Sequence, residues 1–201
     1  MHMFVLLRFG RWDDVLALPQ PDSKFKGLTL IWRYARGCAF AEKGDVAKAE
    51  AERGAMEAVF NELPAGPAFG MLYNDWSAIH DLAAKTLAAR IAAARGDHKG
   101  AITEWRAGVA TQDQMHYNEP PDWYYPVRES LGAALLAYGQ PTEAEQVFRE
   151  DLQQNPRNPR SLYGLWKSLE AQKKPVDAEW VKRSFEAAWK GGTEPPRLAD
   201  Y

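Results

Sequence analysis

The stretch VRESLGAALLAYGQPTEAEQVFREDLQQNP, residues 127–156, holds two helical patterns joined by one turn signal. The apolar positions of the first pattern are Val127, Leu131, Leu135 and Tyr138, and those of the second are Ala144, Val147, Phe148 and Leu152. Between them, Gly139 can end a helix in the left-handed conformation, and Pro141 fits the first turn of the next helix. Each pattern carries a single apolar stripe, so the two helices are expected to pack against each other and against neighbouring helices.

The same turn signal recurs along the chain and sets its period. It reads RFGRWDD, EKGDVAKAE, ARGDHKGAI and AYGQPTEAE, and a fifth copy, QKKPVDAEW, has a lysine in place of the glycine. The corner residues, which are separated by 34, 52, 43 and 34 residues, are Gly10, Gly44, Gly96, Gly139 and Lys173. Asp45 and Asp97 are expected to cap the helices that follow them. The spacing indicates a 34-residue repeat with insertions of 18 and 9 residues in the two middle intervals.

The periodicity and the alanine-rich composition predict an all-α chain. Helices are expected over residues 3–9, 11–18, 28–43, 46–61, 76–95, 98–112, 123–138, 141–154, 159–172 and 175–190.

A known repeat pattern can be compared with residues 128–156. The tetratricopeptide repeat (TPR) reads W-x2-L-G-x2-Y, then A-x3-F, then P, and the residues that match it here are Leu131, Gly132, Ala144, Phe148 and Pro156. Arg128 and Leu135 replace the Trp and the Tyr. The chain therefore resembles the TPR family, and in particular bacterial TPR proteins without an assigned role. The resemblance implies a right-handed α-α superhelix, a solenoid of antiparallel helix pairs.

The resemblance also organises the chain as one helical-repeat domain, residues 1–201. It would hold a partial unit over 1–20, four units over about 28–61, 76–112, 123–156 and 159–190, and a tail over 191–201. The apolar MFVLLRF near the start has no polar outer face, so we expect the chain to form the C-terminal part of a longer array. The tail is expected to pack on the last unit through Leu198 and Tyr201.

In TPR arrays the leading helix of each unit lines a concave groove that holds a segment of a partner. By register, the resemblance nominates these groove residues: Tyr34, Cys38, Arg90, Glu129, Tyr163 and Lys167. It implies a protein or peptide partner. The cluster of Lys, Arg and Asn with which some family members hold acidic chaperone tails is missing, so that partner is not expected.

Two insertions, residues 62–80 and 112–125, each fall between the second helix of one unit and the first helix of the next. Both are therefore expected to emerge on the same side of the chain, where added function is common. Their candidate binding residues are Trp76, His80, His116, Tyr117, Trp123 and Tyr124. The rings around Trp123, in the first turn of the helix expected over 123–138, would either cover the preceding helix pair or grip a ligand.

Bulk properties exclude several functions. The net charge of −2 provides no field for nucleic acid or an anionic membrane, and no apolar run is long enough to span a membrane. The single Cys38 cannot form an internal disulfide, which is compatible with the cytoplasm, where we expect the chain. No metal-ligand spacing, nucleophile elbow or phosphate-binding glycine loop is present, so neither a cofactor nor enzyme activity is expected.

Three functions stay open. The first is a protein-interaction module that binds a partner segment in the groove. The second is a small-ligand or enzyme-like pocket formed by the two insertions, and the third is a structural cap or self-association segment of a longer array, which would allow a homo-oligomer.

Overall fold

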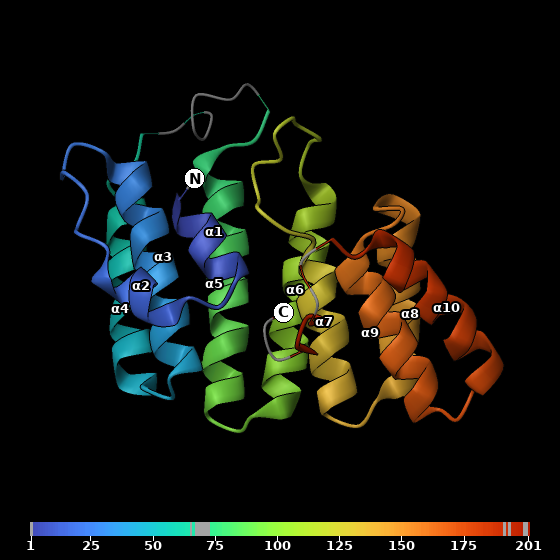
Figure 1. Cartoon of the computed structure of the whole chain (residues 1–201). Helices are drawn as coiled ribbons and strands as arrows, with labels where there is room; N and C mark the ends of the chain where they lie inside the picture. The colour runs from blue at the N-terminus through green and yellow to red at the C-terminus, as the bar shows by residue number, and fades with distance from the viewer. Residues whose placement is uncertain (1, 65, 67–72, 191, 193, 199–200) are drawn as a thin grey trace. The chain divides into compact units, whose positions relative to one another are not determined.

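The computed structural model describes residues 2–64, 66, 73–190, 192, 194–198 and 201, and across these residues the chain is all-α, with ten helices and no strand (Figure 1). The helices are α1 (His2–Arg8), α2 (Trp12–Ala17), α3 (Lys26–Glu42), α4 (Val46–Phe60), α5 (Trp76–Ala94), α6 (His98–Gln114), α7 (Val127–Ala137), α8 (Pro141–Gln154), α9 (Pro159–Ala171) and α10 (Pro175–Ala188). None of them is long and apolar enough to cross a membrane.

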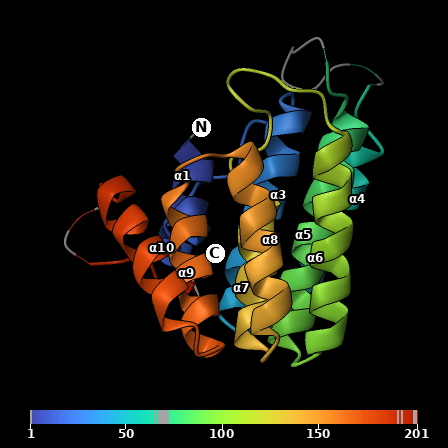
Figure 2. The ribbon, with the colours of Figure 1, turned by 90° about the vertical axis from the view of Figure 1, so that its right-hand side faces the viewer.

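The chain divides into two compact units, Met1–Tyr125 and Pro126–Tyr201. In the first unit, α3 pairs with α4, α5 pairs with α6, and α3 also packs against α5. In the second unit, α8 packs against both α7 and α9, and α10 packs against α9 (Figure 2). Each helix is thus packed mainly against its neighbours in the sequence, as the single apolar stripes predict.

All five predicted corners have the expected backbone. Positive φ angles are found at Gly10, Gly44, Gly96, Gly139 and Lys173. At each corner two hydrogen bonds close the helix end; after α3, the Asp45 N–H donates to Phe40 O and the Gly44 N–H donates to Ala41 O. This is the Schellman arrangement, and it satisfies carbonyls that the helix end leaves unpaired. Asp45 then caps α4 by accepting from the Lys48 N–H, which confirms its predicted role.

The predicted bounds agree with the structure within two residues, except at one helix. Residues 123–126, expected in the first turn of the helix over 123–138, are irregular, and α7 begins at Val127 with Pro126 as its extended N-cap. The cause is local: a proline disfavours the helical conformation of the residue before it, which here is Tyr125. The rings of Trp123, Tyr124 and Tyr125 therefore precede the helix.

The core of the second unit is built around Phe148. This ring is fully buried, and it occupies the space in which Gly132 on α7 and Gly164 on α9 would carry a Cβ. An added Cβ would lie 2.6 Å from Phe148 Cζ at Gly132 and 2.1 Å from it at Gly164. Small residues thus let three helices approach one ring.

The last residue packs on the second unit. Tyr201 is buried, its hydroxyl donates to Arg160 O at 3.0 Å, and the Arg160 guanidinium lies 5.1 Å from the centre of its ring. Packing of the tail through Tyr201 is thereby confirmed, while Leu198 is half-buried.

Candidate functional site

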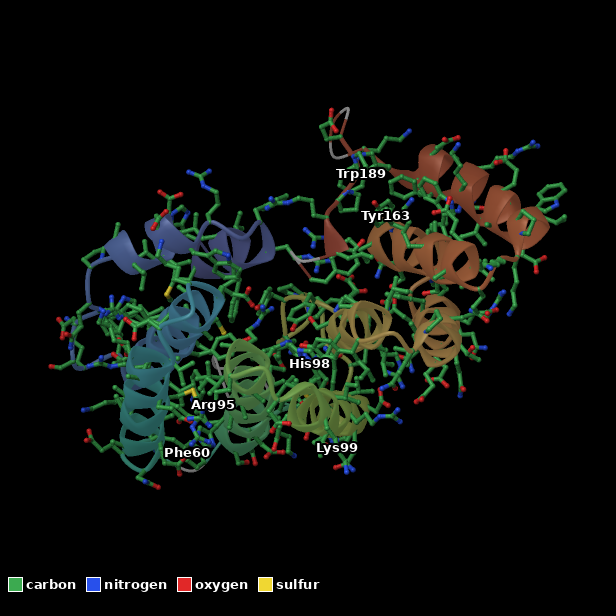
Figure 3. All side chains as sticks on the ribbon, turned by 90° about the horizontal axis from the view of Figure 1, so that it is seen from below. Phe60, Arg95, His98, Lys99, Tyr163 and Trp189 are labelled. Carbon is green, nitrogen blue, oxygen red and sulfur yellow. The ribbon has the colours of Figure 1, made fainter. Side chains whose placement is uncertain are left out.

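The candidate site lies in the first unit, on the face of α3 and α5. Figure 3 shows α1 and α2 on the side of α3 that faces away from α4, and both short helices contact α3. We call the surface that they cover the α3–α5 face: Tyr34 and Cys38 on α3, Thr86 and Arg90 on α5, and the rings of residues 123–125.

Polar groups form the floor of the α3–α5 face. The Tyr34 hydroxyl lies 3.2 Å from Thr86 Oγ1 and 3.4 Å from the Tyr124 hydroxyl, and Thr86 also donates to Leu82 O at 2.9 Å. Tyr34 and Thr86 are fully buried. Burial raises the pKa of the Tyr34 hydroxyl well above its ordinary value, so this group acts as a neutral hydrogen-bonding partner.

A charged pair and the cysteine continue the floor. Arg90 forms an ion pair with Glu42, and its guanidinium lies 5.8 Å from the ring centre of Trp12 on α2 and 5.4 Å from that of Trp105. Burial opposes the charge on Arg90, but the Glu42 carboxylate outweighs it and holds the pKa of Arg90 above its ordinary value. Burial also raises the pKa of the Cys38 thiol to about 11, which leaves it protonated and unreactive at neutral pH.

The helix α1 buries Leu6 and Leu7 and also makes ring contacts on this face. Phe4 stacks on Tyr124 with ring centres 4.6 Å apart and planes 10° apart, and it lies 6.2 Å from Trp123. The Arg8 guanidinium lies 5.5 Å from the ring centre of Tyr125. Trp123 and Tyr125 are buried, and the contacts of the rings at residues 123–125 include Phe4 and Arg8 of α1.

Of the groove residues nominated by register, Tyr34, Cys38 and Arg90 lie together with Thr86 and are buried. Arg90 lies under Trp12 of α2. Sequence reasoning treated residues 1–20 as part of an array and missed this fold-back. The signal was present in MFVLLRFGRW, which places Phe4 and Arg8 one helical turn apart.

The two insertions contact each other. The buried Asn74 side chain joins them: its amide donates to His116 O at 2.9 Å and to Asp122 Oδ2 at 2.7 Å, and its carbonyl accepts from the His116 N–H at 2.9 Å. A cavity of about 470 Å³ lies beside the Asn74 hydrogen bonds, between the start of α5 and the end of α6. Residues 65 and 67–72 of the first insertion lie outside the described part of the chain.

The candidate residues of the insertions do not gather in one place. Only His116 lines the cavity, next to Asp81 and Thr111, which are joined by a hydrogen bond of 2.9 Å. His80 is buried, stacks on Phe60 at 4.0 Å and lies 2.9 Å from a Glu57 carboxylate oxygen.

Trp76 and Tyr117 have different surroundings. The Trp76 ring occupies the space beside Gly27, where an added Cβ would lie 2.1 Å from it, so Trp76 packs against the start of α3. Tyr117 is 79% exposed.

In the second unit, Glu129 belongs to a buried polar network. The Asn158 amide donates to Glu129 Oε1 and to Asp151 Oδ2, both at 2.8 Å, and Ser161 also donates to Asp151. Burial raises the pKa of Asp151 despite these hydrogen bonds. Glu129, nominated for the groove, is fully buried and is likewise unavailable to a partner.

The remaining groove candidates are half-exposed on α9. Tyr163 packs edge-on against Trp166 at 5.6 Å and lies 5.2 Å from Phe185, and the Lys167 ammonium lies 3.9 Å from the ring centre of Trp166 (Figure 3 labels Tyr163). Further along α10, Val176 and Trp180 are exposed.

The described residues contain no group of three His, Cys, Asp or Glu side chains placed to hold a metal ion. No protein-family model matches the chain, and no curated protein matches it significantly.

Proposed function

We propose that this protein is an interaction module that binds an amphipathic helical segment of a partner protein on the α3–α5 face. The observation that supports the proposal is the occupation of this face by a short apolar helix, α1, which the chain itself supplies. The TPR resemblance points to the same habit, because leading helices of such arrays line the binding surface.

The chemistry of the face suits this role. Helix-in-groove recognition depends on a few anchoring side chains that insert among rings, and aromatic and arginine side chains contribute most of the binding energy in such contacts. The α3–α5 face offers three adjacent rings at residues 123–125 and a guanidinium at Arg90, which lies 5.4 Å from the Trp105 ring centre.

Photo-crosslinking tests the proposal. A benzophenone side chain placed at Tyr124 replaces a ring that contacts Phe4, so in the isolated protein it should crosslink to α1. With cell extract present, it should instead capture one partner through an amphipathic segment. The matched control is the same replacement at Tyr117, an exposed tyrosine of the same insertion. Capture from Tyr117 alone, with Tyr124 crosslinking only to its own chain, would rule out the α3–α5 face.

The cavity between the insertions supports a second candidate, a site for a small polar molecule. Its volume of about 470 Å³ lies within the range of ligand sites, and its lining is rich in polar groups, among them Asn74, Asp81 and Thr111. Binding here should shift the NMR signals of Thr111 and His116 and leave those of Tyr34 and Thr86 unchanged. A fragment screen that shifts neither the Thr111 nor the His116 signal would rule out this candidate.

A further inference from the structure

We infer that residues 2–17 are an intramolecular competitor for the α3–α5 face, and that the partner which replaces them is a helix carrying an aromatic and a guanidinium side chain one turn apart. The inference rests on the proposed function, since it assigns a regulation and a partner class to the same site. Its starting point is the occupant seen in the structure, whose Phe4 and Arg8 have this spacing and both contact the rings of residues 123–125.

The covering segment depends on the face for its structure. α1 has seven residues and α2 has six, and isolated helices of this length are unstable in water. Directional contacts between α2 and α3 are few: Trp32 Nε1 and Arg36 Nη1 donate at 3.3 Å to the carbonyls of residues 18 and 16, and Lys43 pairs with Asp13 at 2.7 Å on the surface. The segment is therefore expected to leave the face by unfolding, without disturbing the α3–α6 helix pairs.

The surface under the segment includes polar groups beside its apolar core. The Glu42 end of the Arg90–Glu42 ion pair is exposed, and such a pair brings little net stability compared with apolar packing. In addition, the indole N–H of Trp123 is buried and has no hydrogen-bond partner within the described part of the chain. A partner helix with an acceptor at this point would satisfy a group that the present occupant leaves unsatisfied.

The short link between α2 and α3 explains why residues 2–17 occupy the α3–α5 face. Residues 18–25, which separate α2 from α3, contain Pro19 and Pro21 and keep the segment next to its site. A short tether gives an effective concentration on the order of millimolar. A partner in solution must displace residues 2–17 from the face. Any change that weakens the binding of residues 2–17 should therefore strengthen the apparent binding of the partner by the same factor.

A peptide with the sequence of residues 2–17 serves as the probe. It carries a fluorophore, and its anisotropy is followed on titration with the full-length chain. Replacing Phe4 by Ala in the chain removes the stacked ring from Tyr124, and binding of the peptide should become about tenfold tighter than to the wild type. The matched control is Phe9→Ala, which removes an identical ring that is 65% exposed and should leave the affinity unchanged. The same Phe4→Ala change in the peptide should weaken its binding by about tenfold.

Two further measurements apply if Phe4→Ala perturbs folding. Arg8→Ala removes the other contact of α1 with the rings of residues 123–125, and peptide binding to this variant should also become tighter. Hydrogen exchange on the wild type measures opening of residues 2–17 directly: amides of α1 and α2 should exchange much faster than those of α3. Equal protection of α1 and α3, or no saturable peptide binding by a folded Phe4→Ala chain, would overturn the inference. Crosslinking of a partner to the benzophenone at Tyr124 would then still support the proposed function. Failure of both the crosslinking and the peptide binding would refute the proposed function and the competitor role of residues 2–17.

Discussion

Replacing Gly164 by Ala tests the packing on which the second unit depends. An added Cβ would lie 2.1, 2.4 and 2.5 Å from three carbons of the Phe148 ring, whereas carbon atoms in contact are normally about 3.5–4.0 Å apart. The ring has little room to retreat, because it is fully buried and the same ring atoms already fill the space next to Gly132. We therefore expect Gly164→Ala to lower the free energy of unfolding.

The magnitude follows from two opposing effects. Overpacking a core costs about 1–3 kcal/mol and occasionally more, and the close approach to a fully buried ring places this case at the upper end. Alanine is better than glycine inside a helix by about 1 kcal/mol. The net loss should be about 2 kcal/mol. Gly54 in α4 is the matched control: nothing lies within 4 Å of its added Cβ, so Gly54→Ala should stabilise the protein by about 1 kcal/mol.

The assay is urea unfolding of the full-length chain, followed by far-ultraviolet circular dichroism. A double-mutant cycle adds Phe148→Leu, which shortens the obstructing side chain and should return roughly 1–2 kcal/mol of the loss caused by Gly164→Ala. A Gly164→Ala protein as stable as the wild type, or a cycle without coupling, would refute the close approach of α9 to Phe148.

Two further substitutions and one labelling experiment test separate contacts. Burial raises the pKa of Glu145, but hydrogen bonds from Lys174 and two other side chains outweigh it and lower that pKa to about 2. Glu145→Gln should therefore cost about 1 kcal/mol at neutral pH, and urea unfolding should show this difference fading as the pH falls from about 4.5 towards 2. Asn74→Ala removes the hydrogen bond to Asp122, so we expect the free energy of unfolding to fall by about 1–3 kcal/mol and hydrogen exchange in both insertions to become faster. Cys38, whose pKa burial raises to about 11, should react with iodoacetamide at pH 8 only through opening of residues 2–17 or unfolding; labelling as fast as that of a free thiol would contradict the buried position.

The corners could be predicted from the sequence because their causes are local. A glycine at the end of an apolar stripe, followed by Asp or Pro, carries all the information that a Schellman turn and a new helix need. Even Lys173, where the glycine is missing, adopts φ 59°, because the surrounding pattern imposes the turn. The start of α7 was equally local: the proline rule, applied to Tyr125 and Pro126, would have placed it correctly.

Access to the candidate site could not be predicted in the same way. Helical register places Tyr34 and Thr86 on one face, and the structure joins them at 3.2 Å, but register does not say what covers a face. Cover by α1 depends on contacts between Phe4 and Tyr124, which are 120 residues apart in the sequence. No local pattern encodes such a contact, and an apolar helix at the beginning of the chain fits an adjoining repeat as well as it fits a fold-back.

Two nominated tyrosines show what covers each ring. Tyr34 on α3 and Tyr163 on α9 were nominated by the same register, yet Tyr34 is fully buried while Tyr163 is half-exposed. Tyr34 lies 5.3 Å from the Trp123 ring and its hydroxyl reaches Thr86 on α5, whereas Tyr163 contacts Trp166 and Phe185. If residues 2–17 leave the face, the rings that Phe4 and Arg8 contact, Trp123 to Tyr125, should therefore become accessible first, while Tyr34 stays covered by Trp123. A ring that keeps one packed neighbour while it becomes accessible is suited to anchor a partner helix.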